Sequence, residues 1–278
     1  MTAENAMSFG KPSVAHHQAY GGKSMSEIGQ HIIMSLRDRR VIAPTTEERR
    51  ILARIVLQKA THSGLLTFGL ADTHLHALVT CSRLDANELA RRLEINLVYT
   101  LKLKIGFSRA FVEPVTNGQH LKNLFTYILE QTNHHGLKWD PYKETTNLPD
   151  LLGLRVLGRY TVSNIRQFLP RVTREALLGY FGMTELMPAD DPLDRVVEAG
   201  MTAAGLSSLH GNACEIIDIR RAVIQVVGRR LSTETLAKLL GIDRRTVQRL
   251  RGKPADCQLV EAIRLQLGLI SSLKNDTI

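Results

Sequence analysis

Apolar and polar residues alternate along the first half of the chain in a pattern that predicts both strands and helices. Four short runs of apolar and β-branched residues have the length and composition of strands: 31–36, 65–70, 74–80 and 111–115. Three longer stretches repeat apolar residues every three or four positions, as one face of a helix does: about 45–64, 85–105 and 121–134. Local residues agree, since Thr45 and Glu48 have the spacing of a capping box and Pro114 favours an edge strand.

Taken in chain order, these elements predict a βαββαβα unit. This is the split βαβ, ferredoxin-like arrangement, in which we expect the helices to pack on one face of an antiparallel sheet. The fold class is therefore predicted to be α+β, with a first domain over residues 27–137. Residues 1–26 carry no clear apolar period and are expected to form a weakly ordered leader.

The second half of the chain is predicted to be mainly helical. Residues 138–212 combine linker composition with short helical segments that prolines interrupt. Residues 213–278 form an all-α extension in this interpretation, which begins with an amphipathic helix from Cys214 to Arg230.

Within this extension, residues 232–250 have the pattern of a helix-turn-helix. Ser232 and Asp243 are suited to cap two short helices, and Gly241 suits the left-handed residue that ends the first. The second helix carries side chains of the kinds that read the major groove and contact phosphates: Arg244, Arg245, Gln248, Arg249 and Arg251. We predict duplex DNA contact here; a three-helix bundle with a solvated basic face is the alternative.

The composition favours a polyanionic partner without identifying it. Lys plus Arg outnumber Asp plus Glu by 36 to 27 in 278 residues, a formal net charge of +9. The 3 cysteines are far apart and lack metal-finger spacing, which argues against a structural zinc site and fits a reducing compartment. No apolar run reaches transmembrane length, so we expect a cytoplasmic protein without membrane contact.

Two histidines one residue apart give the clearest indication of chemistry. Alternate strand residues share a face, so His74 and His76 are expected side by side. Two adjacent imidazoles on a strand make half of a divalent metal site, which needs at least one further protein ligand. Tyr127 and Gln131 are four residues apart on the predicted third helix, beside its apolar face. A nucleophile and an amide oxygen that suits a hard divalent ion are therefore expected on one helix.

The combination of His74-Leu75-His76 with Tyr127 and Gln131 resembles the HUH single-tyrosine transposases. That family includes insertion-sequence transposases of single-stranded DNA and the REP-associated tyrosine transposases. The likeness spans about His31 to Leu137 in element order and spacing, including Gly136-Leu137 after the tyrosine. The basic helical extension is similar to that of the REP-associated branch.

The resemblance implies a metal-dependent transposase or endonuclease that cleaves and rejoins single-stranded DNA, with hairpins as targets. Mg²⁺ or Mn²⁺ would be held by His74, His76 and Gln131, and Tyr127 would form a covalent 5′-phosphotyrosine. A homodimer and a DNA-associated place in a bacterial cytoplasm are also implied. The basic residues expected to hold the DNA backbone are Arg37, Arg39, Arg40, Lys102 and Lys104.

Three alternatives stay open from the sequence. The chain departs from the family's usual pattern at Asp72-Thr73 and after Gln131, which leaves room for a non-catalytic, domesticated DNA-binding protein with the same fold. A replication or mobilisation nickase would share the chemistry and differ in biological role. The stretch Asp72-Thr-His-Leu-His76 also resembles the first metal-binding strand of the amidohydrolases, which are barrels of eight parallel strands.

Overall fold

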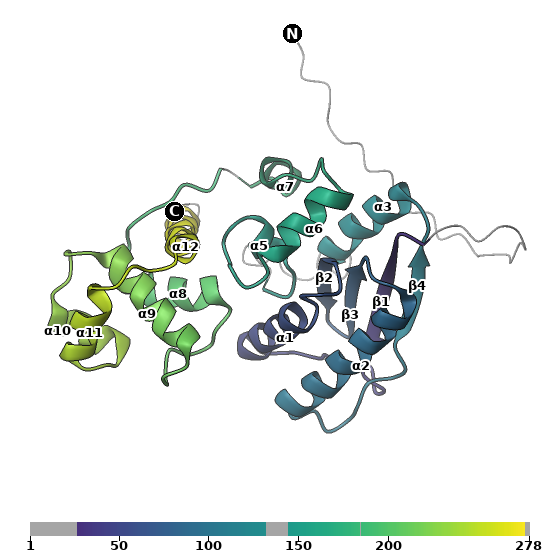
Figure 1. The fold of residues 1–278 in the computed structure, drawn as a ribbon, viewed down its shortest axis with the longest axis horizontal. Helices are drawn as coiled ribbons and strands as arrows, with labels where there is room; N and C mark the ends of the chain where they lie inside the picture. The colour runs from purple at the N-terminus through teal and green to yellow at the C-terminus, as the bar shows by residue number, and fades with distance from the viewer. Residues whose placement is uncertain (1–26, 132–143, 184, 276–278) are drawn as a thin grey trace, which may run out of the picture.

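A four-stranded antiparallel sheet forms the centre of the N-terminal half of the protein (Figure 1). The computed structural model describes residues 27–131, 144–183 and 185–275. The strands lie in the order β2-β3-β1-β4 and match the four predicted runs: β1 (Gly29–Ser35), β2 (Leu65–Ala71), β3 (His74–Val79) and β4 (Phe111–Val115). As predicted, the fold is α+β, and β4, which contains Pro114, is an edge strand. A four-stranded antiparallel sheet over these described residues is not the parallel barrel of the amidohydrolases, so that interpretation is wrong.

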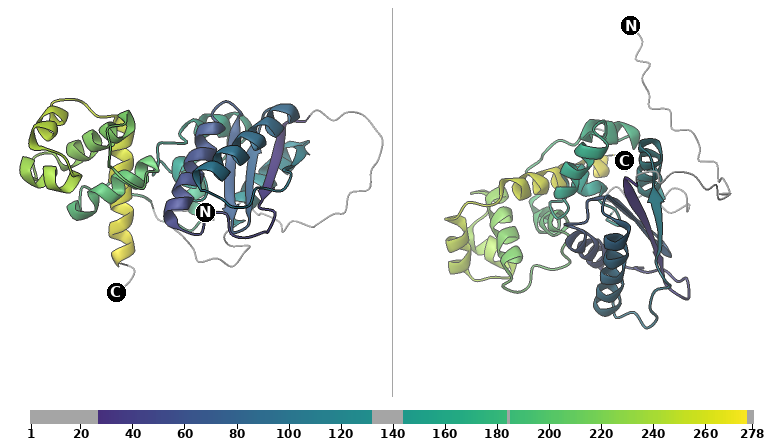
Figure 2. Two further views of the ribbon diagram at one scale, coloured as in Figure 1. Left: turned by 90° about the horizontal axis from the view of Figure 1, so that it is seen from below. Right: turned by 45° about the vertical axis from the view of Figure 1, so that its right-hand side comes forward.

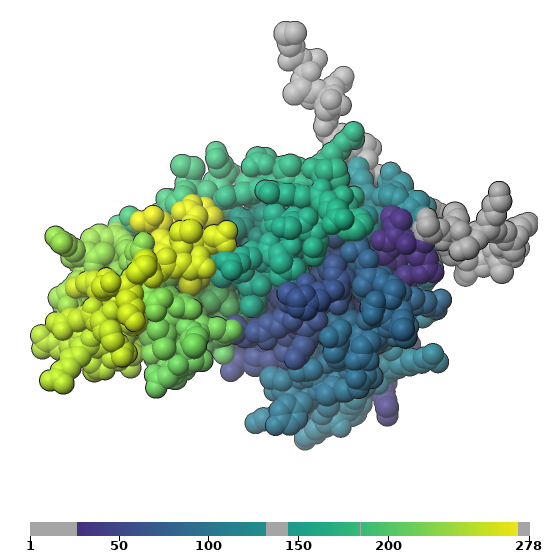
Figure 3. Space-filling view, viewed as in Figure 1, coloured from purple at the N-terminus to yellow at the C-terminus, as the bar shows by residue number. Residues whose placement is uncertain are grey.

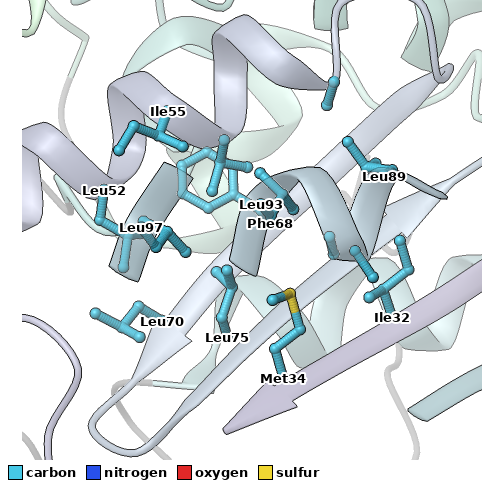
Figure 4. Packing of buried hydrophobic residues seen from close by; sticks show 14 of the residues in the cluster. Ile32, Met34, Leu52, Ile55, Phe68, Leu70, Leu75, Leu89, Leu93 and Leu97 are labelled. Carbon is cyan, nitrogen blue, oxygen red and sulfur yellow. The ribbon is translucent and has the colours of Figure 1, made fainter. Parts of the chain in front are cut away.

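Helices α1 (Thr46–Lys59) and α2 (Arg83–Thr100) pack together on one face of the sheet. The predicted capping box is present at the start of α1. The Glu48 backbone N–H donates to Thr45 Oγ1 at 3.2 Å, and the Thr45 N–H donates to the Glu48 carboxylate at 2.9 Å. Figure 4 shows how the apolar side chains of both helices meet those of the strands, with Phe68 among them.

The other face of the sheet is covered by α3 (Gly118–Leu129) and α6 (Tyr160–Phe168). This corrects the expectation that the helices lie on one face only. Helices α1 and α2 each connect parallel strands across an intervening strand, and such crossovers share a face because they are right-handed. Helix α3 follows the last strand and folds back over Leu66, Leu78 and Val115, which are apolar residues on the opposite face.

Helix α3 is shorter than the sequence predicts. It ends at Leu129, whereas the apolar period extends to about His134. Glu130 follows as the cap residue, and its carboxylate accepts a hydrogen bond from the hydroxyl of Tyr180, the last residue of α7 (Arg174–Tyr180). Gln131 is helical again. Residues 132–143, which include the rest of the predicted helix and Gly136-Leu137, lie outside the described residues, as does the predicted leader.

Residues 145–147 run along β2. The backbone N–H of Leu70 donates to the carbonyl of Thr145 at 3.0 Å. The Asn147 amide donates to the Leu66 carbonyl at 2.9 Å and its oxygen accepts from Thr67 Oγ1 at 2.9 Å. Since Asn147 is fully buried, these bonds satisfy its polar atoms and tie this segment to the free edge of β2.

Helices make up the rest of the described chain (Figure 2). They are α5 (Leu148–Leu151), α6, α7 (Arg174–Tyr180), a short 3₁₀ turn (Leu193–Arg195), α8 (Val196–Ala204), α9 (Cys214–Val227), α10 (Thr233–Leu240), α11 (Arg244–Arg251) and α12 (Cys257–Asn275). Helix α12 contributes to two cores, because Leu265 and Leu269 belong to the core that includes residues of α3, α5 and α6, while Ile263 and Leu267 belong to the core of α8 and α9. In Figure 3 the yellow end of the chain lies against the teal helices.

The C-terminal helices begin and end at the residues predicted for them. Ser232 Oγ accepts from the Thr235 N–H at 3.1 Å, and Asp243 Oδ1 accepts from the Thr246 N–H at 2.8 Å. Gly241 adopts the left-handed conformation with φ 62°. The structure thus contains the two short helices and their turn, whereas their role as a DNA-reading unit stays a prediction, as do the domain boundaries. None of the described helices is both long and apolar enough to cross a membrane.

Candidate active site

His74 and His76 lie on the sheet face that α3 covers. They alternate with Leu75 and Ala77, which point into the core beneath α1 and α2. The two imidazole centroids are 6.2 Å apart. His74 Nδ1 is 2.8 Å from Thr73 Oγ1 in the turn before the strand. The structure therefore confirms that the two histidines share one face of one strand.

Tyr127 is brought to His76 by the close packing of α3 on β2. The two ring centroids are 6.0 Å apart with an interplanar angle of 88°, so one ring stands edge-on to the other. Gly69 lies opposite His76 in the sheet. A Cβ at Gly69 would lie 2.6 Å from the Ile128 carbonyl oxygen, so only glycine allows the helix backbone to approach this strand so closely.

Gln131 occupies an unusual position for an amide side chain. It is only 1% exposed, and neither its Oε1 nor its Nε2 has a hydrogen-bond partner. A buried amide without partners costs free energy, about 1–3 kcal/mol. Such an atom fits a role in binding a group such as a metal ion, because an amide oxygen is a suitable ligand for a hard divalent cation. The break at Glu130 means that Gln131 follows α3 and is not part of it.

A third histidine, which the sequence interpretation did not include, belongs to the same cluster. His31 on β1 lies next to His76, and its Nε2 is 3.1 Å from His76 Nδ1. The two rings are stacked, with centroids 5.3 Å apart at an interplanar angle of 19°. In the sequence, His31 is a lone histidine in an apolar strand. That it lies next to His76 follows only from the pairing of β1 with β3.

The electrostatic environment keeps His31 uncharged. Its side chain is buried, and burial together with the nearby imidazoles of His76 and His120 lowers the pKa of His31 to about 3. The Glu113 carboxylate of β4 approaches from the other side, with Oε2 3.7 Å from His31 Nδ1. Glu113 is half exposed, so its attraction is screened by solvent and does not reverse the effect of burial.

A metal ion at this site would require the amide as well as the imidazoles. Within the described ranges, no three His, Cys, Asp or Glu side chains are grouped so that they could hold a metal ion. His74, His76 and Gln131 would together supply two nitrogens and one oxygen, a donor set that suits Mg²⁺ or Mn²⁺ when water and phosphate complete the shell. The unsatisfied amide of Gln131 is the observation that supports the fit.

The arginines predicted to bind DNA lie in two places. Arg37, Arg39 and Arg40 follow β1 and are exposed; Arg37 Nε donates to the Phe107 carbonyl at 3.2 Å, and Arg40 is 3.6 Å from Asp38. Lys102 and Lys104 are exposed in the connection after α2.

On α11, the predicted DNA-reading residues also face solvent: Arg244, Arg245, Gln248, Arg249 and Arg251. Arg251 differs from the others because its guanidinium donates to Thr233 Oγ1 at 3.1 Å and to the carbonyls of Gly228 and Leu231, both at 3.3 Å. This arginine holds the start of α10 as well as adding to the basic face.

Comparison with known proteins gives little further information. No protein-family model matches the chain, and no curated protein matches it. One solved structure that it resembles is a REP-associated tyrosine transposase bound to a REP hairpin. The identity is 18% and the TM-score 0.34, and the match covers 43% of this chain and 75% of the other. A similarity at this level does not assign a family.

Proposed function

We propose that this protein is a metal-dependent transposase or endonuclease that cleaves and rejoins single-stranded DNA through Tyr127. The observation that carries the proposal is the convergence of Tyr127 on α3 with His76 and His74 on β3. Helix α3 approaches this part of the sheet at Gly69, which lies opposite His76 on the neighbouring strand β2. A phenol held beside two adjacent imidazoles is suited to nucleophilic attack on a phosphodiester whose negative charge is neutralised.

In the proposed reaction, Tyr127 Oη attacks the phosphorus of the scissile phosphodiester. The oxygen–phosphorus bond forms as the bond to the 3′ oxygen breaks. The phenol gives up its proton, and the departing 3′ oxygen takes one up. The products are a 5′-phosphotyrosine and a free 3′-OH. Rejoining is the reverse step with another 3′-OH, and it needs no nucleotide cofactor because the phosphotyrosine keeps the bond energy.

His74, His76 and Gln131 are the residues that would hold Mg²⁺ or Mn²⁺. Such an ion supplies positive charge that stabilises the phosphoryl oxygens and eases loss of the phenolic proton. The chain itself sets the geometry: strand β3 fixes the two imidazoles on one face, and the contact between Gly69 and Ile128 fixes the helix that carries Tyr127. The buried, unpartnered amide of Gln131 supports its role as the third ligand.

The partner we propose is single-stranded DNA with hairpins, as the resemblance to the HUH single-tyrosine transposases implies. The net charge of +9 and the exposed arginines after β1 fit a nucleic-acid backbone. The basic face of α11 would contact duplex DNA nearby. A homodimer and a DNA-associated cytoplasmic location complete the proposal.

A non-catalytic DNA-binding protein with the same fold is the second candidate. Its support is that, over the described residues, the site offers no group of three His, Cys, Asp or Glu ligands and therefore depends on an amide. The two candidates differ in whether a covalent protein–DNA adduct forms.

The test is to incubate the full chain with end-labelled single-stranded hairpin DNA and Mn²⁺ or Mg²⁺, and to separate the products on a denaturing gel. We expect an adduct that Tyr127→Phe abolishes. Tyr99→Phe is a matched control, because Tyr99 is 85% exposed on α2, and it should form the adduct normally. Tight binding with no adduct in either metal would favour the non-catalytic candidate.

A further inference from the structure

The contact between His31 and His76 joins two buried imidazoles inside the protein. His31 Nε2 lies 3.1 Å from His76 Nδ1, and both side chains are more than nine-tenths buried. A hydrogen bond between two imidazole nitrogens needs one nitrogen with a proton and one without. The position of the shared proton therefore decides which nitrogen of each ring keeps its lone pair.

The Glu113 carboxylate favours one direction of this hydrogen bond. Its carboxylate oxygen is 3.7 Å from Nδ1 of His31, the nitrogen on the far side from His76. A negative carboxylate is stabilised by an N–H and repelled by a lone pair, so Nδ1 of His31 carries the proton of that ring. Nε2 of His31 is then the acceptor, and His76 must donate through Nδ1.

We infer that His31 is a positioning residue that holds His76 with its proton on Nδ1 and so directs the Nε2 lone pair of His76 to the metal. The inference rests on the proposed function of His76 as a ligand. Metal-binding histidines generally have their second ring nitrogen held by a neighbouring acceptor, which fixes the tautomer and the ring orientation. Glu113, His31 and His76 form such a chain across three adjacent strands, β4, β1 and β3.

The stacking of the two rings adds a second constraint. Their centroids are 5.3 Å apart and their planes differ by 19°. Two variants can therefore separate the effect of the hydrogen bond from the effect of the stacked ring. His31→Phe keeps an aromatic ring of similar size and removes the acceptor, whereas His31→Gln keeps an acceptor oxygen and removes the ring.

The direct test is the tautomer of His76, measured without metal by long-range ¹H–¹⁵N correlation on the ¹⁵N-histidine-labelled full chain. His76→Ala assigns the resonance. We expect the Nδ1-protonated form of His76 in the natural chain and a mixture of both tautomers in His31→Phe. An Nε2-protonated His76 in the natural chain, or an unchanged tautomer in His31→Phe, would overturn the inference.

A second readout is the affinity for Mn²⁺, measured by calorimetry on the same proteins. His31→Phe should bind Mn²⁺ about 10–100-fold more weakly, and His31→Gln should recover most of that loss. His62→Phe is the control, because His62 is exposed and lies outside the site. Thermal melts show whether each variant is folded. Unchanged Mn²⁺ affinity in a folded His31→Phe contradicts the inference.

Failure of the proposed function gives a different result. If His76→Ala binds Mn²⁺ as tightly as the natural chain, the proposed metal site is wrong. The tautomer measurement still shows whether His31 sets the proton position on His76. If His76→Ala loses Mn²⁺ while His31→Phe keeps it, the metal site is supported and the role of His31 is refuted.

Discussion

Gly69 on β2 lies directly opposite His76 on β3, and a Cβ at Gly69 would stand 2.6 Å from the carbonyl oxygen of Ile128. Ile128 follows Tyr127 in α3, so the absence of a side chain at one strand position sets how closely the tyrosine approaches the histidine. The relationship connects a packing requirement of the sheet with the geometry of the candidate site.

Gly69→Ala is expected to destabilise the protein by about 1–3 kcal/mol, because backbone atoms of α3 must move to admit the methyl group. The same movement displaces Tyr127 from His76 and should lower DNA cleavage more than stability explains. Urea unfolding and adduct yield measure the two effects. Gly118→Ala is the control, since nothing lies within 4 Å of a Cβ there. Equal behaviour of the two variants would contradict the argument.

Replacing Gln131 should separate stability from function. Its amide is buried without hydrogen bonds, so Gln131→Leu removes an unsatisfied polar group and should stabilise the fold by about 1 kcal/mol. It also removes the proposed oxygen ligand, so Mn²⁺ affinity should fall by at least about tenfold. Gln266→Leu, which alters a buried glutamine bonded to the Leu154 carbonyl, should leave Mn²⁺ affinity unchanged. Loss of stability with unchanged affinity in Gln131→Leu would argue against its role.

Local features of the fold were predictable because each depends on residues close together in the chain. The capping box at Thr45, the alternation of β3 and the left-handed Gly241 each follow from short-range geometry. The shared face of His74 and His76 was predictable for the same reason, since a strand places alternate residues on one face.

Long-range features were not accessible in the same way. His31 meets His76 only because β1 pairs with β3 in a particular register, which a single strand pattern does not specify. The end of α3 at Leu129 was also missed, since the apolar period continues beyond it and the contact between Glu130 and Tyr180 comes from a distant helix. The face that α3 covers depends on which apolar residues the other helices leave uncovered.

The basic face of α11 contains two kinds of arginine, and they should respond differently to substitution. Arg245 is exposed, so Arg245→Ala should weaken duplex DNA binding and leave the stability unchanged. The slope of log affinity against log salt concentration should become smaller by about one. Arg251→Ala should cost about 1 kcal/mol of stability, because its guanidinium bonds Thr233 and two backbone carbonyls. Fluorescence anisotropy at several salt concentrations measures the DNA affinity, and urea unfolding measures the stability. Unaltered DNA binding in Arg245→Ala would refute the proposed contact.

Tyr160 makes stability depend on pH in the alkaline range. Its hydroxyl donates to the Leu57 carbonyl at 2.7 Å, and burial, with the nearby Asp150, raises the pKa of Tyr160 above its ordinary value. Below pH about 10 the phenol is neutral in both states and its contribution is complete. Above that pH the unfolded phenol ionises while the folded one does not, so stability falls.

Between pH 8 and pH 11 the natural chain should therefore lose about 1.4 kcal/mol more than Tyr160→Phe. Urea unfolding at the two pH values gives this difference. Tyr99→Phe, at an exposed ring, should show the same pH dependence as the natural chain. A constant difference between the natural chain and Tyr160→Phe across this range would contradict the assignment.

The covalent bond between the protein and DNA can be located directly. The full chain is incubated with single-stranded hairpin DNA and Mn²⁺, the DNA is trimmed with a nuclease, and the protein is digested and examined by tandem mass spectrometry. We expect a nucleotide joined through its 5′ phosphate to Tyr127. A nucleotide on any other residue, or cleavage of the DNA with no adduct at Tyr127, would refute the proposed role of this tyrosine.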